Sequence, residues 1–144
     1  MKISVKKLHP NAMLPTYGSA EAAGADLYAC LDEAVTVQPG EIAWIPTGIA
    51  LEVPKGCAGL IYARSSMGVK RGLAPANKVG VIDSDYRGEI RVVLLNHSKN
   101  PQTVEPGERV AQFLITPVLT PAYEQVQELS DTGRGTGGFG STGK

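Results

Sequence analysis

The chain of 144 residues is long enough for one domain, and a domain of this size can bury roughly two thirds of its unfolded surface without a metal or a disulfide. Its 14 basic and 14 acidic side chains cancel, so neither a nucleic acid nor a membrane is expected as a partner. No stretch approaches the ~20 apolar residues of a membrane span, and the first residues lack the apolar run of a signal peptide. The cysteines, Cys30 and Cys57, lack the spacing of metal ligands and are expected to be free and buried. We therefore expect a soluble, cytoplasmic domain.

The first expected element is a strand over residues 2–8, in which apolar side chains such as Ile3 and Val5 alternate with lysine and serine. A run of small residues follows at 22–25, and small side chains let the backbone approach another group closely. Asp26 comes next, at the expected start of a strand. Its carboxylate either caps a neighbouring backbone or belongs to a site, and the residues around it favour neither role.

Proline–glycine turns divide the middle of the chain into short strands. Pro39 and Gly40 suit the two central positions of a type II turn. The pattern of residues 37–41 returns at residues 104–108, which fits an all-β domain with recurring hairpins, although five residues are too few to establish a repeat. Strands recur at intervals of roughly ten residues and no window keeps a helical period, so the pattern predicts a β-sandwich or jelly roll.

One short helix is expected over residues 65–72. Ser65 or Ser66 can cap its start, and Gly72 can end it. Arg64 precedes the two serines, and a guanidinium beside hydroxyls makes a good anion site. Capping and phosphate binding place the hydroxyls alike, so both roles stay open for the serines.

Residues 77–95 contain the most unusual segment of the chain. Strand-like residues at 79–82 and 90–95 flank a polar stretch at 83–88 whose Asp, Ser and Gly residues favour a chain reversal, which predicts a β-hairpin. The tip holds two carboxylates, a phenol and an arginine. A solvated turn does not require Tyr86 between two charged residues, so the tip is either a charged turn or part of a site.

A later strand carries Arg109 and Gln112, which follow a turn like that of residues 37–41. The two positions have opposite parity and are expected on different faces of the sheet. One of these side chains can pair with a buried carboxylate such as Asp26 while the other faces a site. For Arg109 the structural role is favoured.

The last residues, 130–144, are rich in glycine and cannot fold alone, so the expected organisation is a β-barrel domain over residues 1–129 with a flexible arm over 130–144. A disordered spacer would explain the glycines. It would not explain Arg134, Phe139 and the hydroxyls among them, because such segments cradle phosphates and an aromatic ring can stack on a base. A lid that orders over a nucleotide is the better interpretation.

Five segments together resemble one family, the trimeric deoxyuridine triphosphatases (dUTP diphosphatases). They occur in the family's order and spacing and span nearly the whole chain, at residues 23–27, 64–68, 80–88, 106–112 and 134–143. Two positions depart from the family's pattern, namely Ala63, where proline is frequent, and Ala25, where a larger residue is common. Neither departure removes a reacting group.

The resemblance implies a jelly-roll β-barrel that assembles as a homotrimer, with three active sites shared between subunits. It implies hydrolysis of dUTP to dUMP and pyrophosphate with Mg²⁺, which limits uracil in DNA and supplies dUMP for dTTP synthesis. Asp83 would be the general base that activates water for attack on the α-phosphorus, and such bases contribute ~10²–10⁴-fold to the rate. Asp26 would help to place Mg²⁺ through water, the ion being held mainly by the triphosphate.

The resemblance also implies the substrate ligands. Tyr86 would pack against the sugar and exclude a 2′-hydroxyl, and Phe139 would cover the base. The residues that would read the uracil edge are Asn77, Gly80, Val81 and Ile82. The residues that would hold the phosphates are Arg64, Ser65, Ser66 and Gln112, with Arg134, Ser141 and Thr142 from the arm. Gly138 of the arm would also bind the substrate. Arg91 would be a further substrate ligand.

Two other functions fit parts of the sequence. A dCTP deaminase of the same superfamily has a similar Arg-Ser-Ser segment, but deamination needs an added acid or base beside the base ring, whereas Asp83, Tyr86 and the arm favour the diphosphatase. A non-catalytic jelly-roll module that binds nucleotides or a protein should have lost its reactive positions, and here Asp83, Arg64 and Gln112 are all present.

Overall fold

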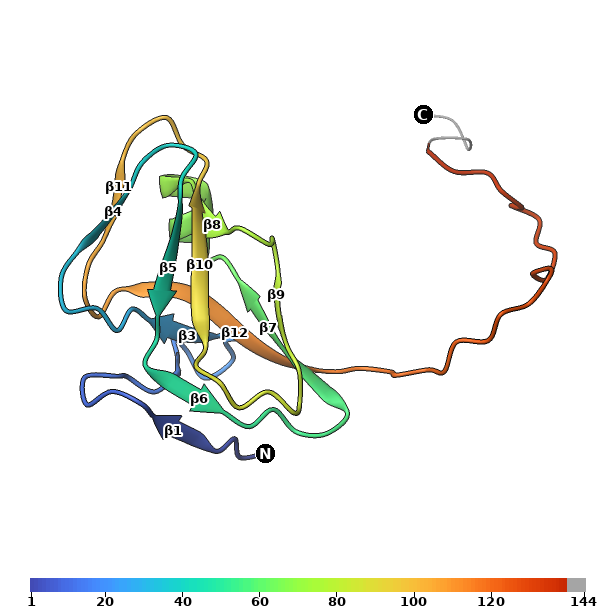
Figure 1. Ribbon diagram of the computed structural model, residues 1–144, viewed down its shortest axis with the longest axis horizontal. Coiled ribbons are helices and arrows are strands. Elements are labelled where there is room, and N and C mark those ends of the chain that lie inside the picture. Colours follow the sequence, from blue (N-terminus) through green and yellow to red (C-terminus); the bar gives the residue numbers. More distant parts are fainter. Residues whose placement is uncertain (140–144) are drawn as a thin grey trace.

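The computed structural model describes residues 1–139, which form short strands and a single turn of π-helix (Figure 1). The strands are β1 (Val5–Lys7), β2 (Thr16–Tyr17), β3 (Ala25–Tyr28), β4 (Val35–Val37), β5 (Ile42–Pro46), β6 (Ile49–Leu51), β7 (Cys57–Tyr62), β8 (Leu73–Pro75), β9 (Gly80–Ile82), β10 (Arg91–Asn96), β11 (Gln102–Val104) and β12 (Arg109–Pro117). The helix is η1 (Ser66–Arg71).

All strand pairs are antiparallel and form a five-stranded sheet, a three-stranded sheet and two ribbons. The large sheet has the order β2-β3-β12-β7-β9, and the smaller one has the order β5-β10-β8. The ribbons pair β1 with β6 and β4 with β11. This almost wholly stranded architecture confirms the predicted all-β jelly roll.

The core contains one apolar cluster to which nearly every long strand contributes. Leu27 on β3, Ile45 on β5, Leu94 on β10 and Val110 on β12 are each no more than 1% exposed. Alternate residues of β10 point inward, so that strand has one buried face and one outer face. Burial of such side chains is the main stabilising contribution to the fold of a domain.

Residues 77–95 do not form the predicted hairpin. β9 pairs with β7 in the large sheet, whereas β10 pairs with β5 and β8 in the smaller one. The polar stretch at 83–88 therefore connects two sheets. Ile90 explains the change of sheet, because it is fully buried and its backbone bonds to Ile49 and Thr47 instead of to β9.

The predicted turns are present. Gly40 has a φ of +80° and Gly107 has a φ of +74°, which only glycine adopts readily. The amide N–H of Glu41 donates to the Gln38 carbonyl at 3.0 Å, as expected for a type II turn. The strands that precede these two similar turns, β4 and β11, pair with each other.

The helix differs from its prediction in how it begins. Gly72 ends it with a φ of +69°, as expected, but Ser65 has helical backbone angles and its side chain makes no capping hydrogen bond. The prediction that Ser65 caps the helix is thus wrong. The Ser65 side chain is exposed and does not cap the helix. Both cysteines are free, as predicted, but they are half-buried.

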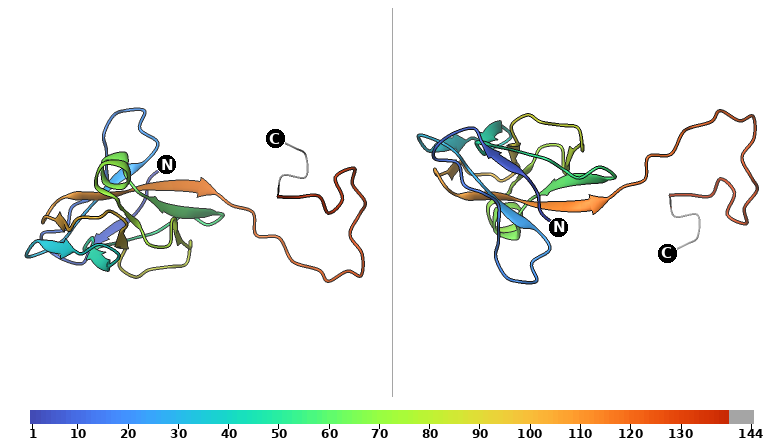
Figure 2. Two further views of the ribbon diagram at one scale, coloured as in Figure 1. Left: turned by 90° about the horizontal axis from the view of Figure 1, so that it is seen from above. Right: turned by 90° about the horizontal axis from the view of Figure 1, so that it is seen from below.

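The chain leaves the barrel after β12, and residues 118–139 run away from it as an exposed segment (Figures 1 and 2). The last strand ends at Pro117, so this extended segment begins upstream of the expected arm at 130–144. The division into a domain over 1–129 and an arm stays a prediction. Among residues 1–139, no helix has the length and apolarity needed to cross a membrane.

Candidate active site

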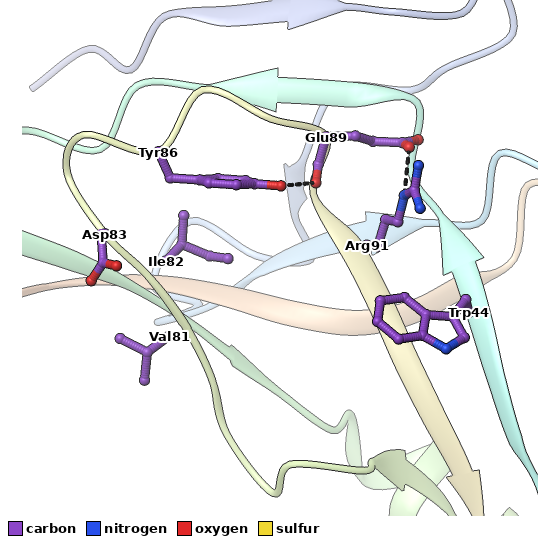
Figure 3. Close-up of a pocket in the computed structure, with 7 residues that line it drawn as sticks. All are labelled: Trp44, Val81, Ile82, Asp83, Tyr86, Glu89 and Arg91. Atoms are coloured by element: carbon purple, nitrogen blue, oxygen red, sulfur yellow. Dashed lines mark hydrogen bonds and ion pairs between the residues drawn. The ribbon is translucent and has the colours of Figure 1, made fainter.

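The side chains that the sequence singled out gather in two separate pockets. The Asp83 pocket has a volume of about 550 Å³, and Figure 3 shows the residues that line it: Trp44, Val81, Ile82, Asp83, Tyr86, Glu89 and Arg91. The Asp26 pocket has a volume of about 270 Å³ and is lined by Gly18, Ala22, Gly24, Asp26, Arg64, Ser65, Arg109 and Gln112. The predicted base and the predicted phosphate ligands of one chain thus lie apart.

The connection between β9 and β10 shapes the Asp83 pocket. The amide N–H of Tyr86 donates to the carbonyl of Asp83 at 3.2 Å, and this tight turn brings both residues to the lining of the pocket. The Tyr86 hydroxyl donates to the Glu89 carbonyl at 3.0 Å. Gly88 makes room for the ring, since a Cβ there would lie 2.4 Å from the phenol oxygen.

Glu89 and Trp44 are pocket residues that the sequence analysis missed. Figure 3 shows Glu89 between Tyr86 and Arg91, with its carbonyl toward the phenol and its carboxylate toward the guanidinium. Two signals were present in the sequence. Glu89 and Arg91 are two residues apart at the start of a strand, which places them on one face, and Trp44 is the chain's one tryptophan.

The Asp26 pocket contains one carboxylate between two guanidiniums. Arg64 Nε lies 2.7 Å from Asp26 Oδ1, and Arg109 Nη1 donates to Oδ2 at 3.2 Å. Asp26 is only 8% exposed, and an ionised carboxylate is stable at such depth only when it is paired. The two cations exceed the one anion by a single positive charge, which suits an anionic ligand.

Arg109 and Gln112 line the same pocket, so their predicted placement on opposite faces is wrong. The reason is a β-bulge in β12. Arg109 is opposite Tyr28, but Ala111 is already opposite Leu27, so one extra residue shifts the alternation between them. The predicted pairing of Arg109 with Asp26 is nevertheless present.

Gln112 is held at the pocket by its neighbours. Its Nε2 donates to the Ala63 carbonyl at 2.9 Å. A Cβ at Gly24 would lie 2.8 Å from its Oε1, so the run of small residues at 22–25 does permit a close approach, as predicted. Ser66 lies beside the pocket, and its hydroxyl accepts from Arg64 Nη1 at 3.3 Å.

Strand pairing explains why the two pockets are separate. β7 and β9 are antiparallel, with Ile82 opposite Gly59, so Asp83 and Arg64 leave opposite ends of this strand pair. The step from Gly59 to Tyr62 spans about 10 Å at the usual rise of a strand. Asp83 and Arg64 lie beyond these positions in opposite directions.

The other predicted ligands line neither pocket. Asn77 is exposed in the turn before β9, and Gly80 is buried with its backbone against Ile61. In the extended segment, Arg134 Nε donates to the Gly137 carbonyl at 2.7 Å, Gly138 has no atom within 4 Å of the Cβ position, and Phe139 is fully exposed. Ser141 and Thr142 lie outside the described residues.

Within the described part of the chain, no three His, Cys, Asp or Glu side chains form a group able to hold a metal ion. Both oxygens of Asp26 are already in ion pairs. These residues fit a Mg²⁺ ion that is held mainly by a phosphate ligand and contacted by the protein through water, which is a usual mode for this cation.

Comparison with known proteins identifies the family. The dUTPase family model matches residues 10–143. The chain is 48% identical to the deoxyuridine 5'-triphosphate nucleotidohydrolase of Syntrophotalea carbinolica over 98% of this chain and 96% of that one, and 46% identical to that of Acinetobacter baumannii over 100% and 99%. The Staphylococcus bacteriophage 80alpha dUTPase with dUPNHPP superposes with a TM-score of 0.90 at 31% identity, over 99% of both chains. Fold, motifs and similarity along the whole length agree, and the chain belongs to the dUTPase family.

Proposed function

We propose that this chain hydrolyses dUTP to dUMP and pyrophosphate with Mg²⁺, as a homotrimer whose active sites are shared between subunits. Membership of the dUTPase family makes it a dUTP diphosphatase. The observation that supports shared active sites is the division of the reactive residues between the Asp83 pocket and the Asp26 pocket. Two half-sites on one chain make whole sites when the Asp83 pocket of one subunit faces the Asp26 pocket of another.

Asp83 is the proposed general base. A water molecule held by its carboxylate attacks the α-phosphorus and transfers a proton to the carboxylate. The new P–O bond forms as the bond from the α-phosphorus to the bridging oxygen breaks, and pyrophosphate leaves with that electron pair. Asp83 is exposed at the pocket, so water can reach it.

The nucleoside is proposed to bind along β9. This strand is at the edge of the large sheet, so among residues 1–139 one side of its backbone faces no other strand. Backbone groups of Gly80, Val81 and Ile82 on that side can read the uracil edge, with Asn77 beside them. Tyr86 would pack on the deoxyribose and leave no space for a 2′-hydroxyl.

The triphosphate is proposed to lie against the Asp26 pocket of the neighbouring subunit. Arg64 and Gln112 supply donors, and the hydroxyls of Ser65 and Ser66 add to them. Arg64 binds Asp26 through Nε at 2.7 Å, and its Nη1 donates to Ser66 Oγ and to the Arg109 carbonyl at 3.3 Å each, so Nη2 is the part of the fork that can face phosphate. Arg91 would add a cation from the Asp83 side.

The extended segment supports assembly. Leu119 is 94% exposed, Tyr123 96% and Leu129 87%, and a row of exposed apolar side chains gains free energy when another subunit covers it. The arm residues Arg134, Ser141 and Thr142 are proposed to close over the outer phosphates, with Phe139 over the base and Gly138 as a further substrate contact.

The metal is proposed to arrive with the substrate. Asp26 would contact Mg²⁺ through water, in keeping with its two occupied oxygens. When bound, the ion neutralises charge on the phosphates and so eases attack at phosphorus. In the cell, the reaction would limit uracil in DNA and supply dUMP for dTTP synthesis.

The test is incubation with Mg²⁺ and dUTP, dCTP, dTTP or UTP in turn, following pyrophosphate and the identity of the base. We expect pyrophosphate from dUTP alone, loss of activity with a chelator and its return with added Mg²⁺. Deamination of dCTP would assign the chain to the deaminase branch. Binding without any reaction of the four nucleotides would favour a non-catalytic module. Light scattering should give the mass of three chains, and an active monomer would contradict the shared site.

A further inference from the structure

We propose that Glu89 is a positioning residue of the Asp83 pocket. It holds the Arg91 guanidinium and the Tyr86 ring in place relative to the same turn of the backbone. This inference rests on the proposed function, because it concerns how the same pocket holds its substrate. Glu89 is one residue that contacts both the cationic and the aromatic side of the pocket (Figure 3).

The Glu89 carboxylate joins Arg91 to a rigid part of the backbone. Its Oε1 accepts from the Gly48 amide N–H at 2.9 Å, and its Oε2 accepts from Arg91 Nε at 2.9 Å. Gly48 is fixed by its surroundings, since its φ is +67° and a Cβ there would lie 2.8 Å from both Ala12 and Cys30. These contacts therefore fix the position of the Arg91 guanidinium relative to the turn between β5 and β6.

The backbone of Glu89 is equally well held. Its carbonyl accepts from the Tyr86 hydroxyl at 3.0 Å. The next residue, Ile90, is fully buried, and its carbonyl accepts from the amide N–H and the hydroxyl of Thr47. The Tyr86 ring is consequently attached to the same β5–β6 turn as Arg91, although Tyr86 is itself on an exposed connection.

Arg91 needs this support because it is otherwise free to turn. Its side chain is 56% exposed, whereas that of Glu89 is 20% exposed. Ordering a long exposed side chain on ligand binding costs conformational entropy, and a side chain that is already oriented avoids much of that cost. The ion pair also neutralises Glu89, which would otherwise repel a triphosphate.

These roles predict that the effects of substituting Glu89 and Arg91 on KM for dUTP are not additive. In Glu89→Gln, the amide oxygen can still accept from Gly48, but the new NH₂ cannot accept from Arg91 Nε. We expect KM for dUTP to rise about threefold to tenfold with kcat little changed. Arg91→Ala should cost more, because it also leaves the Glu89 charge unpaired. The double variant should be no worse than Arg91→Ala alone.

The experiment measures kcat and KM for dUTP with the full chain, its two single variants and the double variant. Binding of dUpNHpp is followed in parallel by the fluorescence of Trp44, the chain's one tryptophan, which lines the same pocket. Glu33→Gln is the matched control, because Glu33 is exposed and outside both pockets. Arg91→Lys should recover part of the loss, since lysine can still pair with Glu89.

The outcomes separate the inference from the proposed function. If the unchanged chain turns over dUTP and the two single effects multiply in the double variant, the positioning role is overturned. If the unchanged chain neither hydrolyses dUTP nor binds dUpNHpp, the proposed function fails and the inference with it. Should Glu89→Gln fail to fold, Glu89→Asp, whose side chain is shorter, replaces it in the double-mutant cycle with Arg91→Ala.

Discussion

Arg64 Nε lies 2.7 Å from Oδ1 of Asp26, and this contact joins the end of β7 to β3 across the intervening β12. Arg109 contacts the other carboxylate oxygen. One buried acid therefore sets the direction of two cations. Arg64 Nη1 donates to Ser66 Oγ and to the Arg109 carbonyl, so Nη2 is the donor of Arg64 that remains for the proposed phosphate contact.

Asp26→Asn should weaken this arrangement, because an amide cannot neutralise two guanidiniums and its NH₂ faces another donor. We expect the free energy of unfolding to fall by about 1–3 kcal/mol and KM for dUTP to rise. Thermal denaturation and steady-state kinetics measure the two effects. Asp32→Asn, at an exposed acid outside both pockets, is the control, and an unchanged KM in Asp26→Asn would argue against a role in substrate binding.

Asp83→Asn should retain nucleotide binding and lose turnover. The amide cannot take a proton from water, so kcat should fall by ~10²–10⁴-fold, while the dissociation constant of dUpNHpp stays similar. Asp85→Asn makes the same chemical change two residues further along, at an exposed acid that does not line the pocket. Turnover close to normal in Asp83→Asn would exclude it as the base.

Gly88→Ala should displace the Tyr86 ring, because the new methyl would lie 2.4 Å from the phenol oxygen. Since the ring is proposed to exclude a 2′-hydroxyl, the ratio of kcat/KM for dUTP to that for UTP should fall at least about tenfold. Both substrates are assayed on one preparation, so a loss of active protein cancels in the ratio. A ratio that stays constant would separate Tyr86 from sugar discrimination.

Deletion of residues 131–144 should leave the barrel folded. Residues 131–139 lie outside the strands, and the core cluster draws on none of them. We expect the same oligomeric mass and a thermal midpoint within a few degrees, with kcat/KM for dUTP reduced at least about tenfold because a closing lid would be missing. Unfolding of the truncated chain would contradict the lid.

The Cys30 thiol should react slowly with iodoacetamide near neutral pH. Burial raises its pKa above the ordinary value, and the nearby Glu89 and Asp32 carboxylates raise it further while Lys7 opposes them. Because the thiolate is the nucleophile, the alkylation rate should still be rising at pH values above the ordinary thiol pKa. Removing the Glu89 charge lowers the pKa, so Glu89→Gln should react faster at pH 8, and Glu33→Gln should not. Mass spectrometry resolves Cys30 from Cys57.

The sequence by itself determined the local features of this protein. The turns at Gly40 and Gly107 follow from the backbone angles that glycine allows, and the strand class follows from side-chain alternation. The five motifs identified the family. The reactive residues of each motif lie within a few positions of one another, so each motif can be recognised from the sequence alone. These properties depend on neighbours along the chain, so a single sequence is enough to predict them.

Tertiary structure alone decided which strands pair and where the reactive residues meet. β9 and β10 are close in sequence but join different sheets, since Ile90 between them is fully buried and its amide N–H bonds to Ile49 of β6 instead of to β9. The bulge before Ala111 moved Arg109 to the face of Gln112. The support of Arg91 by Glu89 depends on Gly48, more than 40 residues away. Such contacts are set by the free energy of packing distant segments together, which no local pattern encodes.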